Sequence, residues 1–303
     1  MMQKSLLLLC VSCMILWGQG YGLTPKQVAP KLYCFFGDLE VPNTKNNGNM
    51  VNTCYIDAGE GWIVFDSGPT YLYAKEAFDA MQGIKSQPVL ALFNSHVHDD
   101  HWLGNGFYHD KGVIIYGPAN FSADHLAIPT RIEEAIQPTF YQGTVPVAPD
   151  YLISAPRTLT IGHIKLQLLT FSDPAHTSND LVLFIPSEGV LLAGDLIFND
   201  RLPSLRDGSL KGWLKALERL KRLSWHVVVG GHGYKTGRDA MHFIDTYLHR
   251  LYRQVKEAME EDVEMGEITK RVRLSEYRTM ALYDLLHGKN VIKAYEELEW
   301  EIE

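Results

Sequence analysis

Six consecutive residues give this sequence its clearest chemical signal. Residues 96–101 read His-Val-His-Asp-Asp-His, which places three of the chain's twelve histidines beside carboxylates within one hexapeptide. Imidazole nitrogens and carboxylate oxygens are ligands that zinc prefers in proteins, so the hexapeptide could contribute to a site for one or two metal ions. A solvated turn that is rich in histidine by chance is the alternative for the hexapeptide taken alone.

Polar residues that could complete such a site stand at the ends of other apolar runs. The hexapeptide itself follows the run 88–93, Pro-Val-Leu-Ala-Leu-Phe. Three more polar residues are placed in the same way: His176 after 164–171, Asp195 after 189–193 and His232 after 226–229. Such runs predict strands, and a strand end is a rigid base for a ligand. If the strands lie side by side, these side chains converge. A turn aspartate and a loop histidine are the alternatives for Asp195 and His232.

The rest of the chain mixes strands and helices. Apolar runs predict further strands at 31–36, 51–57, 62–65, 112–116 and 181–185, and helices are predicted at 71–81, 119–137, 213–223 and, as a long amphipathic helix, 241–259. Residues 138–156, rich in Pro, Gly and Tyr, predict a loop. This loop and Trp102 are candidate walls of a substrate cleft, with ordinary packing as the alternative for Trp102. Helices that flank strand-rich layers predict an α/β sandwich.

The first 22 residues have the layout of a secretory signal peptide. Lys4 precedes an uncharged apolar run from Ser5 to Trp17, and small residues follow it. We therefore expect a periplasmic or secreted protein that has no membrane segment after cleavage; an uncleaved anchor is the alternative. Export places Cys34 and Cys54 in an oxidising compartment, where we expect them to form a disulfide, with two buried thiols as the alternative.

Composition and charge limit the kind of partner. The chain has 303 residues, of which 46% are hydrophobic and 21% charged, and its formal net charge is −8. This length allows one large core or two domains. A nucleic-acid enzyme would usually present a basic face, so the acidic balance argues against a nucleic-acid partner and favours a small-molecule substrate.

The metal-ligand motifs resemble those of the metallo-β-lactamase superfamily. The order His-x-His-x-Asp-His, a lone His, Gly-Asp and a Gly-flanked His matches that superfamily over about residues 31–235. The resemblance implies a four-layer αβ/βα sandwich at 23–236 and a C-terminal helical extension at 237–303, which caps the sandwich or forms a homodimer surface.

The resemblance also implies a role for each candidate ligand. It implies a first metal held by His96, His98 and His176, a second held by Asp100, His101 and His232, and Asp195 as a bridge between them. Asp100 would in addition orient the attacking hydroxide. Asp66, in Phe-Asp-Ser-Gly at 65–68, resembles the superfamily's early aspartate, which would accept a hydrogen bond from a ligand imidazole.

The activity implied is that of a metal-dependent hydrolase. Two zinc ions would generate a metal-bridging hydroxide that attacks the carbonyl of a thioester, ester or lactone. The position of Asp195 is Cys or Ser in the superfamily's true β-lactamases, so aspartate favours the thioesterase, lactonase and phosphodiesterase branches. The motifs at 47–52, 101–105, 194–198, 208–213 and 290–299 are similar to the exported SoxH-type enzymes, also called quinoprotein relay system zinc metallohydrolases, which are related to glyoxalase II.

Three other functions stay open at this point. Iron-dependent persulfide dioxygenases keep much the same ligands, so iron is the alternative metal. β-Lactam hydrolysis could be a minor activity. A metal-binding component without turnover is the third alternative, although a purely structural zinc site would need only four ligands.

Overall fold

Two β-sheets form the centre of the protein, in a computed structural model that describes residues 20–171 and 173–299. Most of the predicted signal peptide lies outside the described residues. The first sheet has seven strands in chain order: β1 (Lys26–Ala29), β2 (Leu32–Phe35), β3 (Thr53–Asp57), β4 (Trp62–Phe65), β5 (Val89–Phe93), β6 (Ile114–Pro118) and β7 (Tyr151–Ile153). The second has the order β12 (Val227–Val229), β11 (Val190–Leu192), β10 (Val182–Ile185), β9 (Ile164–Leu169) and β8 (Arg157–Ile161).

Strand direction brings the loops of interest to one edge of each sheet. In the first sheet β4, β5 and β6 pair in parallel, so the loops after β4 and β5 leave from the same edge. In the second sheet β11 and β12 pair in parallel, and β10 runs antiparallel to both β9 and β11. The carboxyl ends of β9, β11 and β12 therefore share one edge as well. The backbone amide of Leu181 donates to the carbonyl of Ser95, which joins the two sets of loops.

Helices cover the outer faces of both sheets. Between the sheets lies a core of small and branched apolar side chains, among them Ile56, Leu166 and Leu183. On the outer face of the first sheet, α1 (Tyr71–Ile84) and α3 (Asn105–His109) enclose a second core. On the outer face of the second sheet lie α6 (Leu210–Lys221) and α7 (Arg238–Glu260). The four-layer αβ/βα sandwich is thus confirmed.

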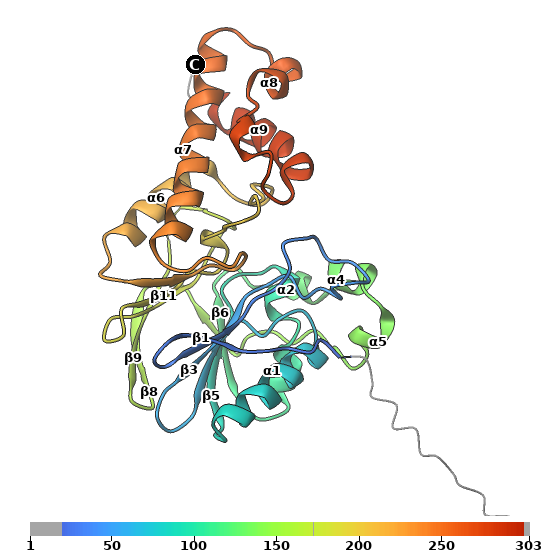
Figure 1. Cartoon of the computed structure of the whole chain (residues 1–303), viewed down its shortest axis with the longest axis vertical. Coiled ribbons are helices and arrows are strands. Elements are labelled where there is room, and N and C mark those ends of the chain that lie inside the picture. Colours follow the sequence, from blue (N-terminus) through green and yellow to red (C-terminus); the bar gives the residue numbers. More distant parts are fainter. Residues whose placement is uncertain (1–19, 172, 300–303) are drawn as a thin grey trace, which may run out of the picture.

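The C-terminal helices share a core with the second sheet. Figure 1 shows α7, α8 (Met265–Arg271) and α9 (Tyr283–Glu299) together at one end of the molecule. One apolar cluster runs from Leu191 in the sheet through Trp213 in α6 and Leu248 in α7 to Val291 in α9. The helical extension is therefore packed onto the sandwich and does not stand apart from it. No helix among the described residues is long and apolar enough to cross a bilayer.

The stretch 119–137 differs from the helix that its sequence predicts. It forms a 3-10 turn at Ala123–Leu126 and, after a break, the short helix α4 (Arg131–Ala135). The break falls at Ile128 and Pro129, because proline lacks an amide hydrogen and disfavours helical geometry in the preceding residue. The side chain of Thr130 then begins α4 by accepting a hydrogen bond from the amide of Glu133. The loop predicted at 138–156 contains α5 (Pro138–Tyr141) and β7.

The described residues begin three residues before the boundary expected for the mature domain, which is residue 23. Tyr21, which we placed in the signal peptide, packs its ring against Tyr73 and Phe140, and its hydroxyl donates to the carbonyl of Asn47. Its backbone amide donates to Glu76.

The two cysteines of the mature chain, Cys34 and Cys54, lie opposite each other on β2 and β3 and are joined by a disulfide.

Candidate metal centre

The seven predicted metal ligands lie together where the edges of the two sheets meet. Four of them form one group, His96, His98, His176 and Asp195, and three form a second, Asp100, His101 and His232. Each group offers ligand atoms that lie within 4.8 Å of one another. We refer to these sets as the first group and the second group, and to all seven residues as the metal centre. Six of the seven are buried, and His98 lies at the rim.

In the first group, three imidazoles turn one nitrogen each toward a common point. His98 Nδ1 lies 3.0 Å from His96 Nε2 and 3.0 Å from His176 Nε2. Asp195 Oδ2 approaches the same point, 3.2 Å from His176 Nε2 and 3.6 Å from His96 Nε2. Three nitrogens and a carboxylate oxygen in this arrangement are a donor set that suits zinc.

Asp195 also belongs to the second group through its position. Its Oδ1 lies 3.2 Å from His101 Nε2, and its Oδ2 lies 3.3 Å from His232 Nε2. Asp100 Oδ2 lies 3.6 Å from both of these imidazole nitrogens. Among the described residues, Asp195 is therefore the one side chain whose carboxylate contacts members of both groups, which is the placement that a bridging ligand needs.

Unpaired buried atoms show that the centre suits cations. Asp100 Oδ2, His101 Nε2 and Asp195 Oδ1 are buried and make no hydrogen bond within the described chain. Unsatisfied polar atoms in a protein interior are costly, and atoms that converge on one point are satisfied together by a metal ion. Gly231 makes room for this convergence: a Cβ there would lie 1.9 Å from Asp195 Oδ1. The residues present thus fit two metal ions.

A buried carboxylate supports one ligand from each group. Asp66 Oδ2 accepts from His101 Nδ1 at 2.8 Å and from Ser95 Oγ at 2.8 Å, while Oδ1 accepts from the amide of Ser95 at 2.7 Å. Ser95 Oγ in turn accepts from His96 Nδ1 at 2.9 Å. These bonds place the protons of His96 and His101 on Nδ1, so that both Nε2 atoms face the centre. Asp66 holds a left-handed backbone with φ 61°, a conformation that non-glycine residues rarely adopt.

The remaining imidazoles differ in their outer partners. His98 Nε2 donates to Asp207 Oδ2 at 2.9 Å, which leaves Nδ1 free to face the first group. His232 Nδ1 donates to the carbonyl of Met50. His176 Nδ1 has no hydrogen-bond partner among the described residues, and its ring packs against Trp213 with 5.1 Å between centroids.

An arginine controls the orientation of Asp100. Arg131, the first residue of α4, donates from Nη2 to Asp100 Oδ1 at 2.6 Å and to Asp99 Oδ1 at 2.7 Å. This bond takes up one oxygen of Asp100, so that Oδ2 is left to face His101 and His232. Arg131 was not among the residues selected from the sequence, since a lone arginine in a polar segment gives no signal of its role.

Charges within the centre set the protonation of its members. Burial lowers the pKa of His96, and His101 lowers it further, which favours the neutral form that binds a metal. Burial would raise the pKa of Asp195, but His232 and His101 outweigh it and hold the pKa well below its usual range. Burial likewise opposes the charged form of His101, yet the carboxylates of Asp195 and Asp66 raise its pKa overall. The carboxylates of the centre therefore stay negatively charged and stabilise a positive charge close to them.

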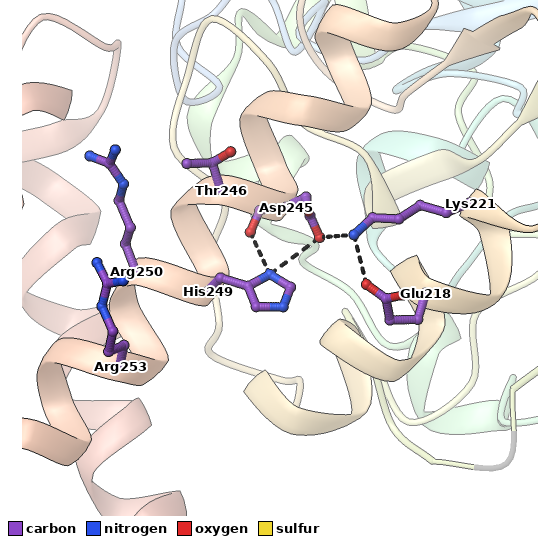
Figure 2. Close-up of a pocket in the computed structure, with 7 residues that line it drawn as sticks. All are labelled: Glu218, Lys221, Asp245, Thr246, His249, Arg250 and Arg253. Atoms are coloured by element: carbon purple, nitrogen blue, oxygen red, sulfur yellow. Dashed lines mark hydrogen bonds and ion pairs between the residues drawn. The ribbon is translucent and has the colours of Figure 1, made fainter.

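A third cluster with metal-ligand residues, which shares no member with the metal centre, lies between α6 and α7. Figure 2 shows Glu218, Asp245 and His249 in a shallow pocket. The ammonium of Lys221 lies 2.7 Å from Glu218 Oε1 and 2.6 Å from Asp245 Oδ1. A protein cation thus already neutralises these carboxylates, and we do not assign a metal to this cluster.

The proposed walls of the substrate cleft receive no support. Trp102 is 1% exposed, packs against Phe121 and donates from Nε1 to the carbonyl of Val97, so it is a core residue. A hollow of about 560 Å³ is lined by Glu133 and by six residues of the 138–144 segment, none of which belongs to the metal centre.

Comparisons with known proteins agree with this geometry. The family model of the metallo-beta-lactamase superfamily matches residues 46–232, which is more than half of the chain. The sequence is 22% identical to metallo-beta-lactamase IND-1 of Chryseobacterium indologenes over 204 residues, 64% of this chain and 77% of that protein. It is 20% identical to a linear primary-alkylsulfatase of Pseudomonas sp. (strain ATCC 19151) over 224 residues, 61% of this chain and 42% of the sulfatase. A metallo-beta-lactamase structure from Pontibacter korlensis superposes with a TM-score of 0.59 at 20% identity, over 75% of this chain and 99% of that one.

Proposed function

The chain belongs to the metallo-beta-lactamase superfamily, and from that premise we propose that it is an exported hydrolase that uses two zinc ions to cleave a thioester, ester or lactone. The observation that carries the proposal is the convergence of two ligand groups on the shared carboxylate of Asp195. Relatives in this superfamily are metal-dependent hydrolases, and this chain keeps the residues that such a centre needs.

The metals would take their places in the two groups described above. When bound, they supply Lewis acidity and lower the pKa of a coordinated water toward about 7. Three of the four donors in the first group are imidazoles, which in their neutral form would not cancel the charge of a bound ion and would keep it Lewis acidic. The zinc assignment is supported by the predominance of imidazole nitrogen among the donors.

The chain's own residues orient the reaction. Asp195, between the groups, fixes the spacing of the two positions. Asp66 and Ser95 hold the ring orientation of His96 and His101. Asp100, tied by Arg131 through one oxygen, has its second oxygen directed at the centre, where it could accept a proton from water during attack on a carbonyl.

The choice of a carbonyl substrate is supported by the residue at position 195. The superfamily's true β-lactamases have Cys or Ser there, and aspartate is typical of the thioesterase, lactonase and phosphodiesterase branches. The similarity to an alkylsulfatase extends the test to sulfate esters. The same motifs that resemble SoxH-type enzymes favour export to the periplasm, with the first residues as a cleaved signal; a homodimer through the helical extension belongs to the same proposal.

Metal analysis together with a substrate panel tests this function. The mature protein is purified without added metal, its zinc and iron are measured, and thioesters, esters, lactones, phosphoesters, sulfate esters and a chromogenic cephalosporin are offered. We expect about two zinc ions per chain and cleavage of a carbonyl ester or thioester. One iron per chain with oxygen consumption on a persulfide would replace the proposal by sulfur oxidation, and two bound metals without cleavage of any substrate would favour a binding role.

A further inference from the structure

The motif at 290–299 lies in α9 and bonds to the loop between β11 and α6. That loop in turn contacts the metal centre. The motif residues Asn290 and Glu297 are seven positions apart in α9, so they lie on the same face of the helix, about two turns apart. We propose that α9 is a positioning element for the first group: Asn290 and Glu297 fix the segment 203–211, and this segment fixes His98 and His176. The inference rests on the proposed metal function.

Asn290 holds the first part of this segment. Its Nδ2 donates to the carbonyl of Pro203 at 2.9 Å, and its Oδ1 accepts from the amide of Leu205 at 3.0 Å. A second donation, to the hydroxyl of Tyr247 at 3.0 Å, anchors the amide to α7. Asn290 is 1% exposed, so these bonds are shielded from water and their loss would leave backbone groups unpaired.

Glu297 holds the second part, where α6 begins. Its carboxylate accepts from the hydroxyl of Ser209 at 2.7 Å, from the amide of Leu210 at 2.7 Å and from the amide of Lys211 at 3.1 Å. The first amides of a helix have no partner within it and favour a negative charge. Ser209 Oγ meanwhile accepts from the amide of Gly212, so the start of α6 is fixed from both sides.

Between these two anchors, the segment bonds to one ligand of the first group, His98, and to Ala175, the residue that precedes a second ligand, His176. Asp207 accepts from His98 Nε2 at 2.9 Å. The amide of Ser209 donates to the carbonyl of Ala175, next to His176, at 2.9 Å. Gly208 lets the two loops approach, because a Cβ there would lie 2.1 Å from the same carbonyl. The Trp213 ring at the start of α6 packs on His176.

Few side-chain contacts fix the position of Asp207. It is 41% exposed, and among the described residues it bonds, besides His98, only to the neighbouring Arg206, whose side chain is 65% exposed. Its placement therefore depends on the backbone of 203–211. Outer partners of metal-bound histidines typically contribute about 10-fold to 100-fold to metal affinity, so movement of this segment should be measurable in the first group.

The test compares Asn290→Ala and Glu297→Ala with Lys289→Ala, whose side chain is exposed on α9 and makes no hydrogen bond or ion pair with the described residues. Zinc affinity is measured by competition with a chromogenic chelator, and the Nε2 proton of His98 is followed by NMR in the zinc-loaded protein. We expect Asn290→Ala to weaken the first group's affinity about 10-fold and to shift or broaden the His98 signal. Lys289→Ala should change neither.

A double-mutant cycle shows whether α9 acts through Asp207. If it does, Asn290→Ala and Asp207→Asn together should weaken zinc binding by less than the product of their separate effects. Fully multiplicative effects, or unchanged affinity and an unchanged His98 signal in both α9 variants, would overturn the inference while leaving the proposed function intact. If the wild-type protein itself binds no metal, the proposed function fails and the inference fails with it. Glu297→Ala, at a partly exposed site, serves if Asn290→Ala does not fold.

Discussion

Two clusters in this protein offer histidine and carboxylate ligands at metal-binding spacing, and they are built very differently. In the metal centre, the side chains of His96 and His101 are 0% exposed and that of Asp195 is 4% exposed. In the cluster of Glu218, Asp245 and His249, the exposed fractions are 52%, 21% and 50%. Ligand type and spacing are similar in both, so these properties alone do not define a metal site.

What separates the clusters is the presence of outer partners and of an internal cation. In the centre, Asp66, Ser95 and Asp207 orient imidazoles, and three inward atoms, Asp100 Oδ2, His101 Nε2 and Asp195 Oδ1, make no hydrogen bond among the described residues. The exposed cluster has Lys221 between its carboxylates, and this interaction lowers the pKa of Glu218. The comparison indicates how a metal site is recognised. Ligand atoms that face the site lack hydrogen bonds, while other atoms of the same side chains are held by hydrogen bonds to outer partners.

Removing a ligand from each cluster should give the largest contrast. We expect His98→Ala and Asp195→Ala each to lower bound zinc and to abolish turnover, because both remove a donor and Asp195 is shared by the two groups. His249→Ala is the matched change in the exposed cluster and should alter neither zinc content nor turnover. Zinc content by elemental analysis and hydrolysis by the active substrate of the panel check this. Unchanged zinc in both centre variants would disprove the ligand assignment.

Removing an outer partner should give the next largest effect. Asp66→Asn keeps the shape but takes away the charge that orients His101 and, through Ser95, His96. We expect zinc affinity to fall about 10-fold to 100-fold, measured by chelator competition. Asp57→Asn, at a carboxylate bound to Lys85 away from the centre, is the control and should leave affinity unchanged. Equal affinities in the two variants would mean that Asp66 does not orient the ligands.

Releasing Asp100 from its arginine should affect the second group more than the first. Arg131→Ala removes the partner of Asp100 Oδ1, so the carboxylate can turn away from the centre. We expect the weaker-bound zinc to be lost at about 10-fold lower chelator concentration, while the other ion stays. Arg131→Lys should recover part of the affinity, since the charge returns without the paired donors. Equal weakening of both ions would show that Arg131 acts on the fold and not on Asp100.

The sequence predicted ligands better than it predicted their partners. The ligand residues fall at the ends of apolar runs, and runs such as 88–93 become strands because burial on both faces requires apolar side chains throughout. Strand direction then brings distant loops together, as expected for strands that lie side by side, whereas the grouping of His232 with His101 came from the family resemblance. Position in the chain was enough to select these residues as candidates because each follows its own strand.

Among the outer partners, Asp66 follows the apolar run 62–65 and was selected from the sequence through the family resemblance, but Asp207 and Arg131 give no such signal. Asp207 and Arg131 reach the centre only because a loop and a short helix fold back over it, and neither follows an apolar run. The helix predicted at 119–137 was wrong for a related reason: its polar residues match helical spacing, but Pro129 interrupts it and the segment packs over Trp102 through a few apolar side chains. Strand β8 was not predicted because it lies at a sheet edge and alternates with exposed residues.

The smallest expected effect addresses the exposed cluster itself. Lys221→Ala removes the ammonium between Glu218 and Asp245, and an exposed ion pair of this kind contributes only about 0–1 kcal/mol to stability, so the fold and turnover should be unchanged. Three ligands then face solvent without a competing cation, and we expect weak zinc binding, far weaker than at the centre, which isothermal titration of the otherwise zinc-saturated variant can detect. Tight binding would mean that burial and outer partners matter less than we infer. An absence of binding would mean that Lys221 is not what keeps a metal from this cluster, and that exposure alone is sufficient to do so.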